Sequence, residues 1–287
     1  MKTRQWAAMA AVWMLAAGAL TPGAAWAQGT SPAAEWNFDE GTGGVAADSL
    51  GQGSGAVLQG GAGWAKGLIG ANALHLSGQT ADADIPKPVI DTSQSYTVMA
   101  WVKLNAIQGF QTIASIDGAN VSGFFLQMRA DTGQFAFAAL PSDNVDAKAV
   151  IASATEEPDS GRWYHLTGVH DAAANTNTLY VDGVKQQTVA APAAWKATGH
   201  TAIGRGFFGS KPVDYVNGDI DDVRFYQSAL PASDIAALVK PDLPPVPPAV
   251  APTLNINAAG PTVRVSPMLY GLMTEEINYS YDGGLYA

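Results

Sequence analysis

The chain has 287 residues and no cysteine, and it carries 25 acidic residues against 15 basic ones, for a formal net charge of −10. The lack of cysteine excludes a disulfide framework, a thiolate metal site and a lipid-modified cysteine. An acidic balance argues against nucleic acid and anionic membrane surfaces as partners, because both need clustered Lys and Arg; it suits neutral polysaccharides and Ca²⁺.

The first 27 residues are predicted to be a secretory signal peptide. Lys2 and Arg4 supply the positive start, residues 6–20 form an uncharged apolar run, and Ala25-Trp-Ala27 supplies a small-residue cleavage site. The alternative is a membrane anchor, but the run is shorter than the about 20 residues that a spanning helix needs. We expect cleavage after Ala27 and a secreted or periplasmic protein. Since the leader removes two basic residues and no acid, the mature chain has a formal charge of −12.

Residues from Ala33 to about Tyr226 read as short strands between turns rich in Gly, Asp, Asn and Pro. Two turns, Asp131-Thr-Gly133 and Asp182-Gly183, predict tight hairpins. Helical periodicity is confined to residues 232–239, which follow a helix-starting proline. The pattern predicts an all-β fold, a two-sheet antiparallel sandwich or jelly roll. The clearest predicted strands cover residues 96–104, 123–129, 134–138, 163–170, 178–181, 184–189, 200–204 and 218–226.

Proline marks the end of this region. Residues 240–252 contain too many prolines for a helix or sheet interior, and they predict an extended, semi-rigid linker. The remaining segment, 253–287, is too short to build a core of its own without disulfides or metal. We therefore predict a signal peptide over 1–27, a folded domain over 31–239, a linker over 240–252, and a truncated start of a second domain over 253–287.

The folded region resembles the laminin-G-like, concanavalin A-like jelly-roll domains of secreted bacterial enzymes. The resemblance implies two antiparallel sheets, often a structural Ca²⁺ ion, and frequently a glycan-binding role beside a catalytic domain. Fold alone does not decide among functions, and some members are spacers. The segments that carry the resemblance are 36–43, 47–49, 73–76, 96–102, 161–166, 179–183, 203–204, 218–226 and 229–231.

A calcium site is expected where the first and last strands meet. Hard cations take six to eight oxygen ligands, from carboxylates and carbonyls. Asp221 and Asp222 are consecutive on a predicted strand and point to opposite faces, so only one of them can face a given ion. By the resemblance, Asp39 and Asp222 are the preferred ligands, with carbonyl groups near 41–44. The alternative is that these acids cap turns or pair with Arg224 or lysines.

Aromatic side chains in loops are the candidates for sugar binding, because a ring face can stack on the C–H groups of a sugar. Phe207 and Phe208 stand between two glycines, and Trp195, Trp64 and Tyr215 also lie outside clear strands. The alternative is that each ring covers an edge of the core. The four histidines fall on predicted strands without metal-ligand spacing, and no hydrolase or nucleotide-binding motif occurs, so no catalytic residue is predicted in the sandwich.

The C-terminal segment resembles the opening of family 51 glycoside hydrolases, the α-L-arabinofuranosidases. The matching residues are Val265-Ser-Pro-Met-Leu-Tyr-Gly-Leu-Met-Thr-Glu-Glu-Ile-Asn278 and Asp282-Gly-Gly-Leu-Tyr-Ala287. The resemblance implies that Glu275 contacts a bound arabinose at the start of a barrel, and that both catalytic carboxylates lie further downstream. A (β/α)₈ barrel needs about 250 residues, so this chain alone is predicted to be inactive.

These features favour a non-catalytic carbohydrate-binding or accessory module of a secreted α-L-arabinofuranosidase that acts on plant polysaccharide such as arabinoxylan or arabinan. Its partner would be a polysaccharide or oligosaccharide, with no nucleic acid and no membrane. Two other hypotheses stay open: an adhesion domain of the same fold without enzymatic association, and a spacer. The sequence leaves the oligomeric state open.

Overall fold

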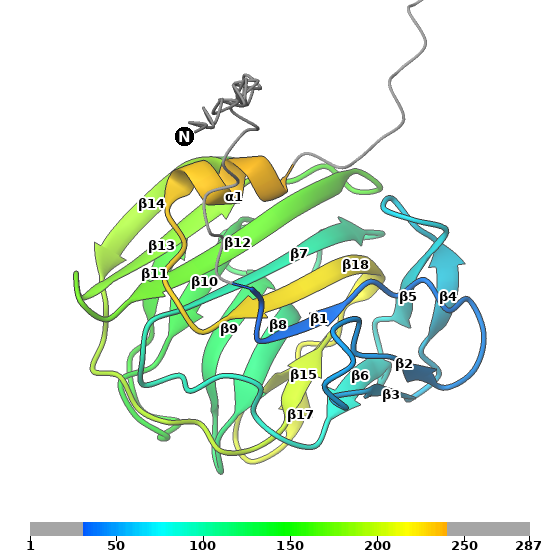
Figure 1. Ribbon diagram of the computed structural model, residues 1–287. Helices are drawn as coiled ribbons and strands as arrows, with labels where there is room; N and C mark the ends of the chain where they lie inside the picture. The colour runs from blue at the N-terminus through cyan, green and yellow to red at the C-terminus, as the bar shows by residue number, and fades with distance from the viewer. Residues whose placement is uncertain (1–30, 240–287) are drawn as a thin grey trace, which may run out of the picture. The chain divides into compact units, whose positions relative to one another are not determined.

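The computed structural model describes residues 31–239, and in this range the chain forms two antiparallel sheets of eight strands each (Figure 1). Sheet 1 has the order β14-β13-β12-β7-β18-β5-β4, with β1 also paired to β18. Its strands are β1 (Ala34–Trp36), β4 (Gly63–Lys66), β5 (Asn72–Ser77), β7 (Tyr96–Leu104), β12 (Trp163–Asp171), β13 (Thr176–Val181), β14 (Val184–Ala190) and β18 (Asn217–Tyr226).

Sheet 2 has the order β11-β10-β9-β8-β15-β6-β3-β2. A further ribbon of two short strands, β16 and β17, belongs to neither sheet. The strands of sheet 2 and of the ribbon are β2 (Val45–Ala46), β3 (Ala56–Gln59), β6 (Asp82–Ile85), β8 (Gln111–Asp117), β9 (Ser122–Met128), β10 (Phe135–Ala139), β11 (Val150–Ser153), β15 (Thr201–Ile203), β16 (Gly206–Phe207) and β17 (Pro212–Val213). The predicted all-β jelly-roll sandwich is confirmed.

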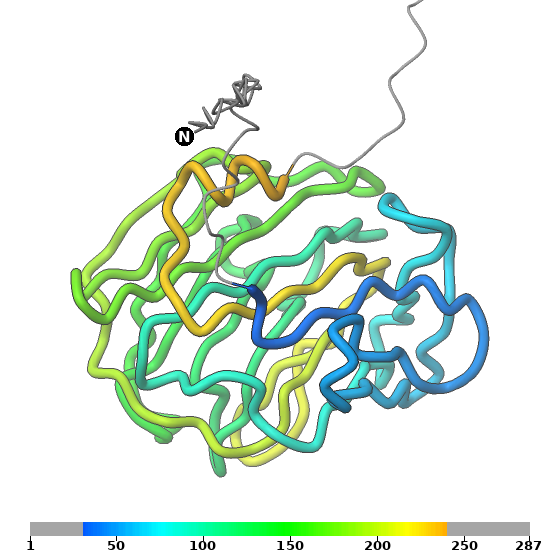
Figure 2. The backbone as a smooth tube through the Cα atoms, viewed as in Figure 1, coloured from blue at the N-terminus to red at the C-terminus, as the bar shows by residue number. Residues whose placement is uncertain are grey.

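The first and last strands of the described region are neighbours. Glu35 in β1 pairs with Arg224 in β18, both across the backbone register and through an Nε–Oε1 hydrogen bond of 2.8 Å. Figure 2 traces this arrangement, with the blue start of the domain running beside the yellow-orange strand that ends it. The same pairing brings the acids predicted as metal ligands to one region of sheet 1.

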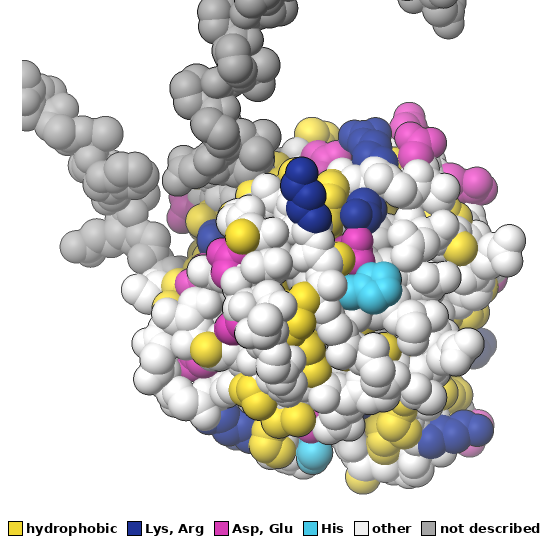
Figure 3. Space-filling view, turned by 90° about the vertical axis from the view of Figure 1, so that its right-hand side faces the viewer, with side chains coloured by type: hydrophobic (Ala, Val, Ile, Leu, Met, Phe, Trp, Pro, Cys, Tyr) yellow, Lys and Arg dark blue, Asp and Glu magenta, His cyan; other side chains and the backbone are white. Residues whose placement is uncertain are grey.

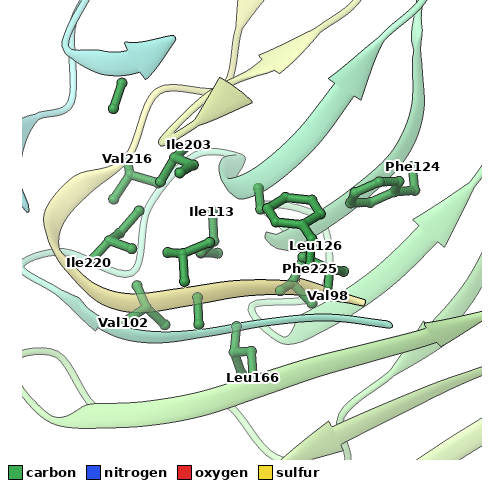
Figure 4. Close-up of a cluster of buried hydrophobic side chains, with 14 of the residues drawn as sticks. Val98, Val102, Ile113, Phe124, Leu126, Leu166, Ile203, Val216, Ile220 and Phe225 are labelled. Atoms are coloured by element: carbon green, nitrogen blue, oxygen red, sulfur yellow. The ribbon is translucent and has the colours of Figure 1, made fainter. Parts of the chain in front are cut away.

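The core lies between the two sheets. In β7 the alternate residues from Tyr96 to Leu104 point inward, as their period-two pattern predicts. Figure 4 shows Val98 and Phe225 from sheet 1 near Leu126 from sheet 2, and Val102 and Ile220 from sheet 1 near Ile113 from sheet 2. All of these side chains are fully buried, which is the main favourable contribution to folding.

Glycine allows one especially close contact across this core. A Cβ atom on Gly168 in β12 would lie 2.4 Å from the ring of Phe137 in β10, which no real Cβ tolerates. The phenylalanine therefore fills the space that a side chain at Gly168 would need.

The two predicted hairpins have the backbone that their turn residues indicate. Gly133, between β9 and β10, has a φ of 69°, and Asp182 and Gly183, between β13 and β14, have φ values of 51° and 75°. Positive φ at both central residues is the requirement of the two-residue turn that joins twisted strands.

A single helix in residues 31–239, α1 (Ala232–Leu238), packs on the outer face of sheet 1. Pro231 precedes it, as predicted. Ile235 is fully buried against Met99, Val169 and other apolar side chains of β12, β13 and β18. The helix therefore gives the outer side of sheet 1 a second, smaller core.

Candidate binding site

The outer face of sheet 2 carries a hollow of about 340 Å³, which we call the binding groove. Its floor comes from the side chains of β9 and β10 that alternate with the core residues. Phe124 and Leu126 point into the core, whereas Phe125 and Gln127 point outward, and Ala138 lies opposite Phe125 in the register. The floor is therefore mainly apolar, with one amide.

One wall of the groove is the β16–β17 hairpin, which is held on the sheet by backbone contacts. The Phe207 N–H donates to Ser122 Oγ at 3.0 Å, and the Thr112 N–H donates to the Asp214 carbonyl at 2.7 Å. Gly206 permits this approach, because a Cβ there would lie 2.9 Å from the ring of Phe125. The hairpin is thus a fixed part of the site.

A second wall is the loop of residues 141–149, which contributes Val145, Ala147 and Ala149. Asp143 anchors this loop, because its carboxylate accepts backbone N–H groups from Ala119, Asn120 and Val121 at 2.7–2.9 Å. A loop fixed through one carboxylate to three amides can hold apolar side chains at a constant distance from the floor.

Two exposed aromatic rings line the groove. Phe208, at the end of β16, is 43% exposed, and Phe110, before β8, is 37% exposed. Arg129 lies over the Phe110 ring, 5.4 Å from its centroid, and its guanidinium is also paired with Asp131 through an Nε–Oδ1 contact of 3.0 Å. The Phe208 ring is free for a ligand, whereas Arg129, which already has a counter-ion, covers one face of Phe110.

Two polar side chains in the groove have no partner among residues 31–239. Gln127 is only 4% exposed, yet its amide makes no hydrogen bond. The Asp214 carboxylate has no ion pair and no hydrogen bond, and burial alone raises the pKa of this group. Buried polar groups are nearly always paired, so unpartnered ones that face a cavity are available to a ligand.

A second, more polar cavity of about 430 Å³ adjoins the groove. The two hollows share Phe110 and Asp214 in their linings. The second one also includes Gln108, Tyr215 and Asn217. Phe110 and Asp214 therefore stand at a junction between an apolar hollow and a polar one.

A buried charge cluster lies on the same side of sheet 2. Arg205 is 6% exposed and pairs with Asp82, Asp84 and Asp117 at 3.2, 3.0 and 2.9 Å. Burial raises the pKa of Asp82 to about 6, against the lowering effect of Arg205. His200 Nδ1 contacts Asp84 at 2.8 Å. The Ser115 hydroxyl donates a hydrogen bond to the Arg205 carbonyl at 3.0 Å. Together with the ion pairs of the cluster, this bond fixes the position of the chain that leads into β16.

The predicted aromatic residues do not all meet at one site. Phe208 lines the groove, whereas the adjacent Phe207 does not. Trp195 packs against the core, donates its Nε1–H to the Leu140 carbonyl at 3.0 Å and lines a separate small hollow. Tyr215 lies in the second cavity. The Trp64 Nε1–H donates to the Gly43 carbonyl at 3.0 Å, and the ring packs on the core. Glu275 lies outside the described residues.

Sequence reasoning missed Phe110, Gln127 and Asp214. Phe110 had the signal that selected Phe208, namely a phenylalanine next to a glycine in a loop. Gln127 faces outward only because of its place in the strand alternation, which the core pattern of β9 could have revealed. Asp214 gave no sequence signal, because its isolation depends on which charges the fold places around it.

The predicted metal ligands lie in one region of sheet 1. Asp39 Oδ1 accepts the backbone N–H groups of Ala71 and Asn72, and the Asp39 carboxylate contributes to raising the pKa of Asp222, after burial as the largest cause. Asp222 Oδ1 also lies 3.0 Å from Arg224 Nη2, as the ion-pair alternative expects. The neighbouring Asp221 Oδ1 is buried without a hydrogen-bond partner in the described part of the chain.

Residues 31–239 also lack two kinds of feature. No group of three or more His, Asp or Glu side chains in this range is arranged to hold a metal ion. Over the same residues, no helix has the length and apolar character to cross a membrane. On the side shown in Figure 3, charged side chains of both signs are interspersed with small apolar clusters, and neither sign dominates that face.

The fold is that of a concanavalin A-like sandwich. The sequence profile of the "Concanavalin A-like lectin/glucanases superfamily" matches residues 77–236, more than half of the chain. The protein therefore belongs to this superfamily. Comparison with curated proteins gives no significant match.

Solved structures with the same fold include domain 4 of AbnA, an extracellular GH43 arabinanase from Geobacillus stearothermophilus, in complex with arabinotriose. The TM-score is 0.61 at 21% identity, over 74% of this chain and 99% of that one. The ligand-binding domain of botulinum neurotoxin serotype D in complex with N-acetylneuraminic acid has a TM-score of 0.53 at 17% identity, over 73% and 50% of the two chains. The binding domain of Paraclostridial Mosquitocidal Protein 1 has a TM-score of 0.56 at 16% identity, over 72% and 51%.

Proposed function

We propose that this protein is a non-catalytic carbohydrate-binding module and that its ligand is held in the binding groove. The observation that carries the proposal is the combination of an exposed aromatic ring, Phe208, with an unpartnered amide, Gln127, on one rigid surface. The ring offers an apolar face to sugar C–H groups, and the amide offers a donor and an acceptor to hydroxyl groups. Ligand sites of this kind combine an apolar lining with a few placed polar groups.

Two likenesses support the choice of a plant polysaccharide. The arabinanase domain that shares the fold was solved with arabinotriose, and this ligand is the basis for proposing an arabinose-containing one here. The resemblance of residues 265–287 to the opening of an α-L-arabinofuranosidase, with Glu275 as an arabinose contact, is independent of it. We therefore propose that the module belongs to a secreted or periplasmic arabinofuranosidase and binds arabinoxylan or arabinan.

We also propose a structural calcium ion next to β1 and β18, the first and last strands of the domain. Asp39 and Asp222 would supply carboxylate oxygens, and backbone carbonyl groups and water would complete the shell. The supporting observation is that the two carboxylates lie close together, since the Asp39 charge contributes to raising the pKa of Asp222. The ion would stabilise the pairing of β1 with β18 and take no part in sugar contacts.

The test is retention of the full chain on insoluble arabinoxylan and arabinan, with and without EDTA, for the natural protein and for Phe208→Ala. The proposal predicts retention of the natural chain and loss in the variant. Retention that the variant shares would place binding elsewhere. No retention on either polysaccharide would favour the adhesion or spacer hypotheses.

A further inference from the structure

We propose that the site selects neutral oligosaccharides whose chain extends from the binding groove into the adjoining polar cavity, with Asp214 as the residue that excludes acidic sugars. This inference rests on the proposed function and adds the class of ligand. It comes from the arrangement of charges and cavities around the junction of the two hollows.

The two hollows adjoin each other and share two lining residues. Phe110 and Asp214 line both of them, and their volumes are about 340 and 430 Å³. Each volume alone lies in the range of sites for drug-sized ligands, which are larger than one sugar ring. A ligand that fills both must therefore be a chain of several sugar units that passes between Phe110 and Asp214.

The two arginines on this side of sheet 2 are already paired, and the exposed Lys148 and Lys211 line neither hollow. Arg129 is paired with Asp131 and stacked on Phe110. Arg205 is buried and is surrounded by three carboxylates. Neither guanidinium is left to pair with the carboxylate of a uronic or sialic acid, which is a strong and common way for a protein to bind an acidic sugar.

The negative charge at the junction, in contrast, is uncompensated. The Asp214 carboxylate has no hydrogen-bond or ion-pair partner among residues 31–239, and it lies where the ligand chain must pass. An ionised carboxylate accepts hydrogen bonds at both oxygens, so it can take the hydroxyl groups of a neutral sugar. A sugar carboxylate at the same place would face a like charge, which specific sites use to reject wrong partners.

The binding groove, on one side of the junction, fits the apolar part of the same ligand. Phe208, Ala138 and Val145 offer apolar surface, and Gln127 is the polar exception. The proposed ligand therefore places C–H faces of one part of the chain against the groove and hydroxyl groups of the next part at Asp214 and in the polar cavity.

The experiment measures dissociation constants of the full chain by calorimetry for neutral arabino-oligosaccharides of two to six units and for oligogalacturonates of the same lengths. The natural protein is expected to bind the neutral series more tightly as the chain lengthens, and to bind the acidic series at least about tenfold more weakly. In Asp214→Asn the ratio between the two series is expected to shrink at least threefold. Asparagine suits the positive φ of 57° at this position, so the backbone is preserved.

Asp234→Asn, in α1 on the other sheet, is the control that changes net charge by the same amount without touching the groove. It is expected to leave the ratio unchanged. Equal affinity for the two series, or a ratio of dissociation constants that Asp214→Asn does not change, would overturn the inference. In that case, weaker binding of the oligosaccharides by Phe208→Ala would still support the proposed function. If neither series binds, the proposed function fails and this inference fails with it.

Discussion

Replacing Phe208 by alanine removes the most exposed aromatic ring of the binding groove. The side chain is 43% exposed. A phenylalanine buries about 150–250 Å² when fully covered, so roughly 90 Å² of this residue is left for a ligand to cover. At about 25 cal/mol per Å², that area is worth about 2 kcal/mol, an upper limit because ordering the ligand offsets part of it. We therefore expect the Kd for a neutral oligosaccharide to rise about tenfold.

The same substitution should leave the fold intact, because the ring is at the surface. The free energy of unfolding is expected to change by less than about 0.5 kcal/mol. The matched control is Val184→Ala, an exposed apolar side chain on β14, at the edge of the other sheet. Calorimetric titration of the two variants separates the cases: equal affinities in Phe208→Ala and Val184→Ala would refute the assignment of the groove as the sugar site.

Three further predictions concern stability. Gly168→Ala forces a Cβ against Phe137 and should lower the free energy of unfolding, measured in urea, by about 1–3 kcal/mol. Gly63→Ala, whose Cβ would meet no other atom, should not lower it in this way, and equal effects of the two variants would contradict the packing argument. Burial raises the pKa of Asp82 from its ordinary value of 3.8 to about 6, so the native state holds this proton more tightly and the resulting stability is lost as pH rises from about 4 to 6. Asp82→Asn should flatten that slope and add up to about 3 kcal/mol to the free energy of unfolding above pH 6. An unchanged dependence of urea unfolding on pH between about 4 and 8 in the variant would contradict this reasoning. Calcium at 100 times its Kd should stabilise the protein by about 2.7 kcal/mol and raise the melting temperature. EDTA or Asp222→Ala should abolish this stabilisation, and identical melting temperatures with and without calcium would exclude the proposed ion.

The architecture could be predicted from local patterns, because short-range physics determines them. The alternation over 96–104 selects the buried face of a strand, and Asp182-Gly183 selects the turn that two twisted strands require. The single short helix follows from Pro231 and the apolar spacing behind it. None of these features depends on distant parts of the chain.

The site was only partly predictable, because it is assembled from segments far apart in the sequence. Phe208 could be named from its flanking glycine, but its adjacent residue Phe207 was equally eligible until the register of β16 was known. The availability of Gln127 and Asp214 depends on the absence of partners, which only the packed structure decides. The pairing of Arg129 with Asp131 is local, yet its consequence for ligand charge appears only beside Phe110.

The most direct test of the central claim is a crystal structure of the chain with arabinotriose. We predict that the sugar lies on the outer face of sheet 2, against Phe208, with hydroxyl groups at Gln127 and at Asp214. A sugar bound on sheet 1 or at the loops away from β16–β17, with the groove empty at saturating ligand, would contradict the account.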